Sequence, residues 1–250
     1  MMRLPLPASF SPPLAALALC CALLAALPVL PARWLLLALP DDAMATLADA
    51  DGTIWHGSAR LALGPPGGRH LLSEPLRWQW RDGAVEISHA WLRGPVRVQP
   101  GWSGITVSGQ NLRLPAAALA AFGAPLNTVA PAGQVEIEWR SFSPSRLPAS
   151  GTLATGHWTN AGSALSHVRP LGDYTLRVTA DNGALRLALS TDSGVLSVTG
   201  QGRLQRGRLH FRGEAAPADN ATPAQRAALT GLLSALGPVS NGKSHFGTPQ

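Results

Sequence analysis

The residues best suited to catalysis or metal binding are isolated from one another in this sequence. Its seven histidines are spread along the chain, and no two of them stand at metal-ligand spacing on one expected helix. They are His56, His70, His89, His157, His167, His210 and His245. The segment "GWSG" at 101–104 holds a serine between glycines, but it lacks the spacing of a nucleophile elbow. We therefore expect neither a metal site nor a nucleophilic serine.

Glu136 and Glu138 are the pair of carboxylates that could form a coupled acid site, because residues two apart on a strand share a face. Arg140 continues the same face and favours a simpler interpretation, a solvated charged surface. No glycine-rich phosphate-binding loop accompanies them. We expect a protein that is not an enzyme, with no catalytic residues, no cofactor and no metal.

Charge and cysteine content exclude two further classes. The net charge is +6, but the arginines occur singly, whereas nucleic-acid binding requires a clustered basic patch. We expect no nucleic-acid partner. The two cysteines, Cys20 and Cys21, lie in the apolar N-terminal run, so the rest of the chain can form no disulfide. Cys20 could be a lipoprotein cysteine, but Leu19 is bulky where such a site requires a small residue. We therefore favour the other interpretation, that both cysteines are small apolar residues facing lipid.

The N-terminal run predicts a membrane segment. From Pro13 to Leu30 no residue is charged, and about eighteen residues are near the minimum for crossing a hydrocarbon core. A signal peptide cleaved near Ala26 is the alternative. We favour an uncleaved signal anchor, because the run is longer than a typical signal core and ends at an interfacial tryptophan. The expected anchor residues include Leu14, Leu17, Leu23, Leu24 and Trp34.

The segments that we expect are a cytoplasmic N-terminus at 1–12, a transmembrane signal anchor at 13–34, a connector at 35–52, a periplasmic β domain at 53–240 and a flexible C-terminus at 241–250. The β domain is predicted from alternation of apolar and polar residues, which is typical of half-buried strands. It occurs from Thr53 to Leu63, in "LRWQWR" at 76–81, in "VEIEWR" at 135–140, and in three later segments starting at 174, 184 and 208. Most arginines fall on the polar face of these strands.

Two kinds of local signal join the strands. "RDGA" at 81–84 and "DNGA" at 181–184 predict tight hairpins. Two alanine- and leucine-rich segments, at 114–123 and 222–237, predict short helices, the second with a start at Thr222-Pro223 and a stop at Gly237. Trp55, Trp78 and Trp80 are expected to fill the sheet face, with Trp55 buried in the first strand.

Several segments together resemble the type II secretion system protein N family. They are "GTIWHGSA" at 52–59, "EPLRWQW" at 74–80, "RPLGDYTLRV" at 169–178, "SGVLSVTGQG" at 193–202, "LHFRGEA" at 209–215 and "LLSALG" at 232–237, after the anchor and "LPARWLLLALP" at 30–40. The order of these segments carries the resemblance, which covers nearly the whole chain. The motif residues are Gly52, Thr53, Trp55, Gly57, Trp78, Gly172, Tyr174, Gly200, Phe211 and Gly213.

The resemblance implies an accessory subunit of the Gram-negative type II secretion system, held in the inner membrane by one N-terminal helix with its bulk in the periplasm. It implies no catalytic residues. By analogy with AsmA-type proteins, it also implies a curved, mostly antiparallel, one-sided β-sheet domain with two short helices.

Two function classes remain open. In the first, the protein docks other secretion-system components through sheet edges or its polar face. In the second, the apolar sheet face binds or transfers lipid. A face closed by the helices favours the first class, and an open apolar groove favours the second. We favour a protein partner, because the resemblance to the family implies one.

Overall fold

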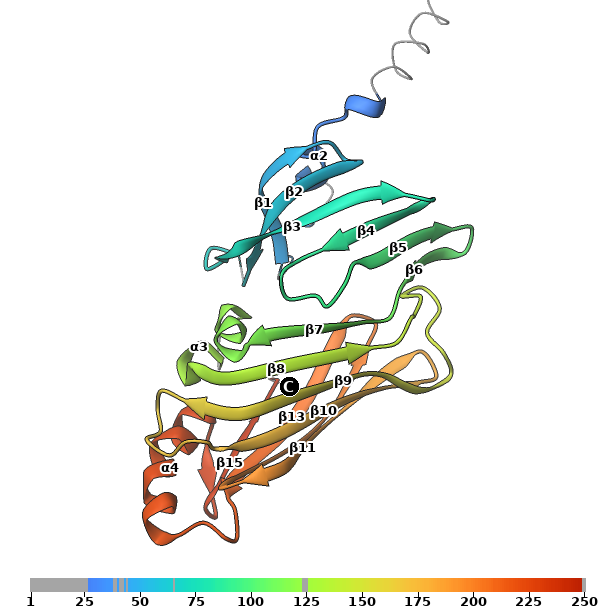
Figure 1. Ribbon diagram of the computed structural model, residues 1–250. Helices are drawn as coiled ribbons and strands as arrows, with labels where there is room; N and C mark the ends of the chain where they lie inside the picture. The colour runs from blue at the N-terminus through green and yellow to red at the C-terminus, as the bar shows by residue number, and fades with distance from the viewer. Residues whose placement is uncertain are drawn as a thin grey trace, which may run out of the picture.

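The computed structural model describes residues 27–37, 40, 43, 45–64, 66–122 and 126–248. Within them, the chain forms two antiparallel sheets, one after the other along the sequence (Figure 1). This confirms the prediction of a mainly β, antiparallel fold. Most of the membrane segment predicted at 13–34 lies outside the described residues. Among those that are described, no helix is both long and apolar enough to cross a membrane.

The first sheet is a meander in which each strand pairs with the next along the chain, in the order β1-β2-β3-β4-β5-β6. Antiparallel neighbours can be joined by tight turns, so the connections are short. The strands are β1 (Ala45–Gly52), β2 (His56–Leu63), β3 (His70–Arg81), β4 (Ala84–Ser88), β5 (Val96–Gly101) and β6 (Gly104–Val107).

The second sheet has the order β14-β15-β13-β12-β11-β10-β9-β8-β7. Its strands are β7 (Gln110–Pro115), β8 (Pro131–Trp139), β9 (Ser150–Ser163), β10 (Gly172–Asp181), β11 (Ala184–Gly194), β12 (Leu196–Gln205), β13 (Arg208–Pro217), β14 (Val239–Ser240) and β15 (Lys243–Gly247). Every strand segment predicted from alternation lies in a strand, except that Thr53–Trp55 precede β2 and Arg140 follows β8.

Both predicted hairpin turns are present. In the turn from β3 to β4, Asp82 and Gly83 have φ of 50° and 74°. In the turn from β10 to β11, Asn182 and Gly183 have φ of 47° and 81°. Positive φ at both central residues defines a type I′ turn, whose twist matches that of the flanking strands. These four residues therefore fix the register of two hairpins locally.

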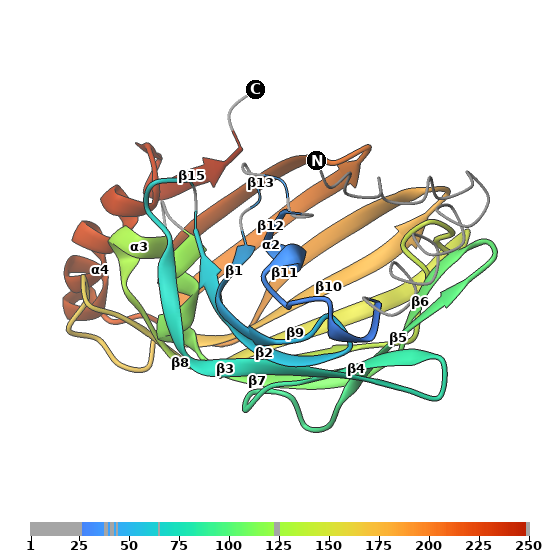
Figure 2. The ribbon, with the colours of Figure 1, turned by 90° about the horizontal axis from the view of Figure 1, so that it is seen from above.

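Backbone hydrogen bonds join the two sheets into one curved surface. The Arg93 N–H donates to the Asn111 carbonyl at 3.0 Å, and the Arg113 N–H donates to the Trp91 carbonyl at 2.8 Å. Val107 and Phe142 exchange a further pair at 2.8 and 3.0 Å. Seen from above, the strands curve around a trough (Figure 2).

Short helices cover part of the apolar face. Besides η1 (Leu27–Val29) and α2 (Trp34–Leu37), they are η2 (Ala116–Phe122), α3 (Leu126–Val129) and α4 (Pro223–Leu236). Val129 of α3 packs in one cluster with Leu229, Leu232 and Leu233 of α4. Because α3 precedes β8 and α4 follows β13, the sheet must curve around this cluster for the two helices to meet. The apolar face is therefore concave at this end.

The start of α4 follows the predicted signal. The Thr222 hydroxyl accepts a hydrogen bond from the Gln225 N–H at 3.3 Å, and the Gln225 side chain accepts one from the Thr222 N–H at 2.8 Å. This capping box satisfies two backbone N–H donors at the helix start. The helix predicted at 114–123 differs, because Leu114 and Pro115 belong to β7 and the following alanines form the 3-10 helix η2. Leu114 is buried opposite Val135 of β8, and this strand pairing outweighs the weak propensity of a short alanine run.

The expected domain boundaries need two corrections. The predicted connector at 35–52 contains β1, because Leu47 and Ala50 pack against the core around Trp78. The predicted flexible C-terminus at 241–250 contains β15, where Ser244 is fully buried and Phe246 packs against Phe211. Both segments carry apolar residues at positions where a neighbouring strand can bury them.

Candidate interaction surfaces

The motif residues Gly52 to Gly57 form a turn that leads into β2. Gly52 has φ of +86°, a conformation that glycine adopts without strain. The Thr53 hydroxyl accepts from the His56 N–H at 3.1 Å, and the Thr53 N–H donates to the His56 carbonyl at 2.9 Å. A Cβ on Gly57 would lie 2.6 Å from the ring of Trp78. The motif is thus a compact turn packed on the tryptophan of β3.

This turn holds residues at the C-terminal end of the predicted membrane segment 13–34. The Trp55 indole N–H donates to the Leu27 carbonyl at 2.6 Å, and the Ile54 N–H donates to the Leu30 carbonyl at 3.0 Å. The Ala32 N–H donates to the Gly52 carbonyl at 3.0 Å. The expectation of a buried Trp55 inside the first strand is wrong. Trp55 is half-buried in a bend, because its indole reaches back to the N-terminal segment.

The later motif residues also pack the sheet. Tyr174 is buried, and its hydroxyl donates to the Leu196 carbonyl at 3.0 Å, which ties β10 to the start of β12. Burial, and then the nearby Asp173 carboxylate, raise the pKa of the Tyr174 phenol. At Gly172, a Cβ would collide with the backbone of Ser193.

Two glycines of the motif lie beneath aromatic rings. A Cβ on Gly200 would be 2.5 Å from the ring of Phe211, and one on Gly213 would collide with the ring of Phe246. The two rings are 6.2 Å apart between centroids. The motif residues in the described sheets therefore shape the fold and are not gathered around one reactive cavity. Of the expected anchor residues, Trp34 is exposed in α2, and Leu14, Leu17, Leu23 and Leu24 lie outside the described residues.

The polar groups on the sheet engage one another. Glu136 accepts hydrogen bonds from Asn111 at 2.7 Å and from Arg113 at 3.1 Å, and these two bonds, in that order, lower the pKa of the Glu136 carboxyl. A general acid would require the opposite shift. Among the described residues, no three histidines, cysteines or acids gather as a metal site.

A second polar chain contains His157, Thr175 and Asp192. The Thr175 hydroxyl donates to Asp192 at 2.6 Å and lies 3.0 Å from Nδ1 of His157. The single hydroxyl proton of Thr175 points to the Asp192 carboxylate. His157 must therefore donate its own N–H to the Thr175 oxygen, and it is not placed to act as a base toward Thr175. This chain joins β9, β10 and β11.

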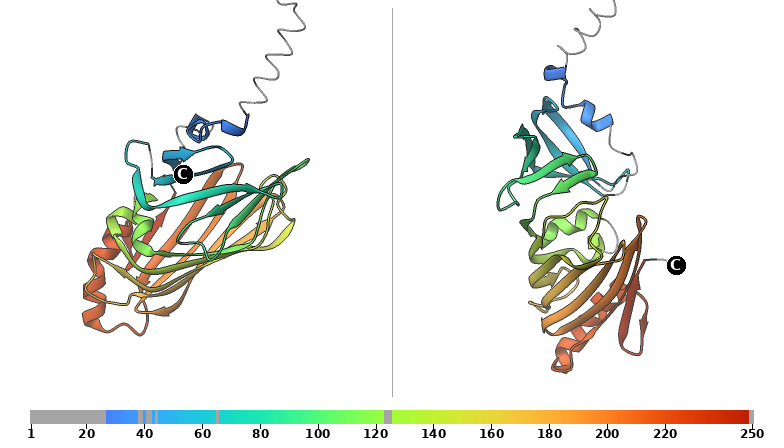
Figure 3. Two further views of the ribbon diagram at one scale, coloured as in Figure 1. Left: turned by 45° about the horizontal axis from the view of Figure 1, so that its top comes forward. Right: turned by 90° about the vertical axis from the view of Figure 1, so that its right-hand side faces the viewer.

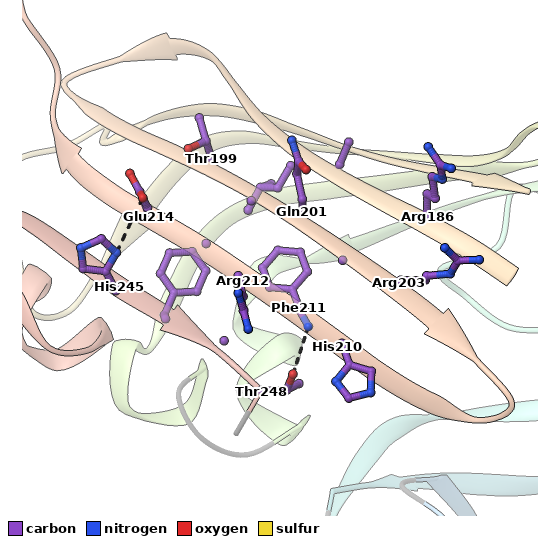
Figure 4. Close-up of a pocket in the computed structure, with 17 residues that line it drawn as sticks. Arg186, Thr199, Gln201, Arg203, His210, Phe211, Arg212, Glu214, His245 and Thr248 are labelled. Atoms are coloured by element: carbon purple, nitrogen blue, oxygen red, sulfur yellow. Dashed lines mark hydrogen bonds and ion pairs between the residues drawn. The ribbon is translucent and has the colours of Figure 1, made fainter. Parts of the chain in front are cut away.

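Arginines gather on the polar face of β11, β12 and β13 and in the turn that joins β12 to β13. Arg186 lies directly across from Arg203, and Arg203 lies directly across from His210. We name as the arginine surface the five side chains Arg186, Arg203, Arg206, Arg208 and Arg212, all of which are exposed. An open hollow of about 1260 Å³ lies beside them, lined at one end by Arg186, Arg203 and His210 and at the other by Glu214 and His245 (Figure 4).

Sequence reasoning missed the arginine surface, because each arginine alone is an ordinary polar-face member of a strand. The signal that could have revealed it is "RLQRGRLHFR" at 203–212, which holds four arginines and one histidine without an acid across a hairpin. Arg186 joins the group only through the register of β11 with β12.

The apolar face between the helices is partly covered. Leu176, Leu187 and Leu189 lie there and are half-buried, while the clusters of α4 and η2 cover other parts of this face. Three tryptophans, by contrast, are exposed: Trp34 by 56%, Trp80 by 43% and Trp102 completely. Trp80 lies on the same sheet face as Trp78, as expected, but it is not buried.

A family model described as "Type II secretion system (T2SS), protein N" matches residues 43–246, which span the chain from just before β1 to β15. The chain therefore belongs to the type II secretion system protein N family. No curated protein and no solved structure matches it.

Proposed function

We propose that the protein is an accessory inner-membrane subunit of the type II secretion system that acts through protein contacts in the periplasm. The observation that carries this proposal is the extent of the family match. It includes both sheets and α4, so the whole described β domain is the family's domain. Membership in this family supports other secretion components as partners.

The fold offers such partners two kinds of contact. Edge strands present unpaired backbone N–H and carbonyl groups, to which a partner strand can be added. β1 is one edge strand of the first sheet, and β14 is one edge strand of the second. The exposed Trp80 and Trp102 add apolar contact area of the type found at interface centres.

The proposed location rests on the N-terminal sequence and on the position of η1. η1 lies at one end of the molecule, beyond the first sheet (Figure 3). We expect a periplasm-dependent reporter joined after Thr248 to be active, and the mature protein to keep residues 1–32. Edman or mass-spectrometric sequencing of the purified N-terminus is the check. A processed terminus near Ala26 would contradict the anchor.

Co-purification tests the proposed function. We expect the tagged full-length chain, cross-linked in membranes of its own host, to retain identified type II secretion components. An unrelated single-span inner-membrane protein at the same expression level is the control. Recovery of these components at the control level, together with unchanged secretion after deletion of the gene, would contradict the proposal.

Lipid binding is the second candidate, and the half-buried leucines of the apolar face favour it. Organic extraction of the same purified material separates the two candidates. Stoichiometric phospholipid that disappears in a Leu187→Ser variant would support lipid binding. Lipid-free protein that still retains secretion components would support the subunit.

A further inference from the structure

We propose that the arginine surface, Arg186, Arg203, Arg206, Arg208 and Arg212, binds an extended acidic segment of a protein partner. The proposal rests on the proposed function, because it specifies the chemistry of one partner contact. The charges and the shape of β11, β12 and β13 support it.

The charges on this surface are not balanced within the described part of the chain. Asp181 is the carboxylate that pairs with the surface, at 2.7 Å from Arg186 and 3.9 Å from Arg203. None of the described carboxylates forms an ion pair with Arg206, Arg208 or Arg212. Five arginines thus share one counter-charge.

The register places these like charges side by side. Arg186 and Arg203 are cross-strand neighbours. Like charges directly opposite each other destabilise a sheet. Glu214, at the far end of the hollow, is engaged by Lys243 at 3.3 Å and lies 3.7 Å from His245. An anion that bridges the arginines would remove this repulsion, which gives the surface a specific preference for negative charge.

The shape of the surface favours a polypeptide over a bilayer. Arg186, Arg203 and Arg212 line the open hollow of about 1260 Å³, whereas a flat membrane can reach only its rim (Figure 4). Neighbouring strands are about 4.8 Å apart and alternate residues about 6.8 Å apart. Carboxylates on alternate residues of an extended chain have the same spacing, so one segment can reach several arginines.

The position of the arginine surface in the fold also favours a polypeptide over a bilayer. The nine-stranded sheet that carries it is separated from η1 by the six-stranded sheet (Figure 1). If the chain is anchored through the residues before η1, the arginine surface lies away from the anchored end. The edge of β13 beside it is also open in part, because β15 pairs only with Arg212–Ala215 and Thr248 bonds to Phe211. Leu209, exposed by 42%, can add an apolar contact there.

The test uses the full-length protein in phosphatidylcholine nanodiscs and a fluorescent peptide of about ten residues that alternates Glu and Ser, long enough to span roughly 33 Å. A Gln-Ser peptide of equal length is the ligand control. We expect fluorescence anisotropy to show binding of the Glu peptide alone, weakening as salt rises, because salt screens exposed charges.

The variant Arg203→Gln/Arg212→Gln is expected to weaken binding about tenfold, since it removes two of the exposed ion pairs that the peptide would form. Arg77→Gln/Arg140→Gln is the matched control, because it removes the same charge from exposed arginines elsewhere on the sheets. It should change binding less than about twofold.

Three results would overturn the proposal: equal binding of the Glu and Gln peptides, equal losses in the two double variants, or arginine-dependent binding to phosphatidylglycerol vesicles without peptide binding. The last would assign the surface to an anionic membrane. Peptide binding does not depend on which components co-purify, so the failure of this inference and the failure of the proposed function are distinguishable.

Discussion

Replacement of Trp78 by alanine is expected to destabilise the protein by about 3–5 kcal/mol, the usual cost of removing a large aromatic side chain from a core. The Trp78 ring is 5% exposed and packs with Ala32 and Ala59, and its indole N–H donates to the Thr53 carbonyl at 3.1 Å. The variant would lose this burial and would leave the Thr53 carbonyl without its side-chain donor.

Trp80 provides a matched control on the same strand. It is 43% exposed and makes an edge-to-face contact with Trp55 at 5.7 Å between ring centroids. Trp80→Ala should therefore cost only about 1 kcal/mol, the range of one such aromatic contact. Urea unfolding of the full-length chain in detergent, followed by far-ultraviolet circular dichroism, measures both changes. Equal losses for the two variants would show that the strand does not bury Trp78 as the structure has it.

Replacement of Leu229 by alanine is expected to cost about 3–4 kcal/mol, within the range for buried leucines. Leu229 is completely buried in the cluster that joins α4 to Leu171, Leu196 and Ala215 of the sheet. The lost methyl groups would leave a cavity where the two helices meet on the concave face. Unfolding in urea, under the conditions used for Trp78, measures this loss.

Ser234→Ala is the control for the helix itself. Ser234 is exposed on α4, so its replacement should change the free energy of unfolding by less than about 0.5 kcal/mol. If Leu229→Ala cost no more than Ser234→Ala, α4 would not hold the apolar face closed. That face would then be available for lipid, and the second candidate function would gain support.

The local structure of this protein is determined by its sequence over a few residues at a time. Asp82-Gly83 and Asn182-Gly183 specify type I′ turns because their backbones adopt positive φ readily. Thr222 and Gln225 specify the start of α4 because their side chains reach each other's backbone. Alternation specifies which face of each strand is apolar, because successive side chains point to opposite sides. The family resemblance, confirmed by the match over 43–246, rests on these same local patterns.

Tertiary structure decided what alternation leaves open, namely how deeply a face is buried and which side chains become neighbours. Trp78 and Trp80 share a face, but only Trp78 lies beneath the N-terminal segment around Ala32. Trp55 was expected in the core, but it bonds to Leu27, a contact between residues 28 positions apart. The secondary structure of the short alanine run after Leu114 could not be predicted from that run alone, because the pairing of β7 with β8 fixes where β7 ends.

The arginine surface, too, is determined partly by the sequence and partly by the tertiary structure. The sequence pattern predicts that the arginines lie on polar faces. It does not predict the register in which β11 pairs with β12 and Arg186 lies opposite Arg203. Charge density depends on distances between strands, and these arise only when the sheet forms. The pairing of β11 with β12 and of β12 with β13 therefore turned singly spaced arginines into one surface. The type of each residue and the face it occupies were already determined by the sequence.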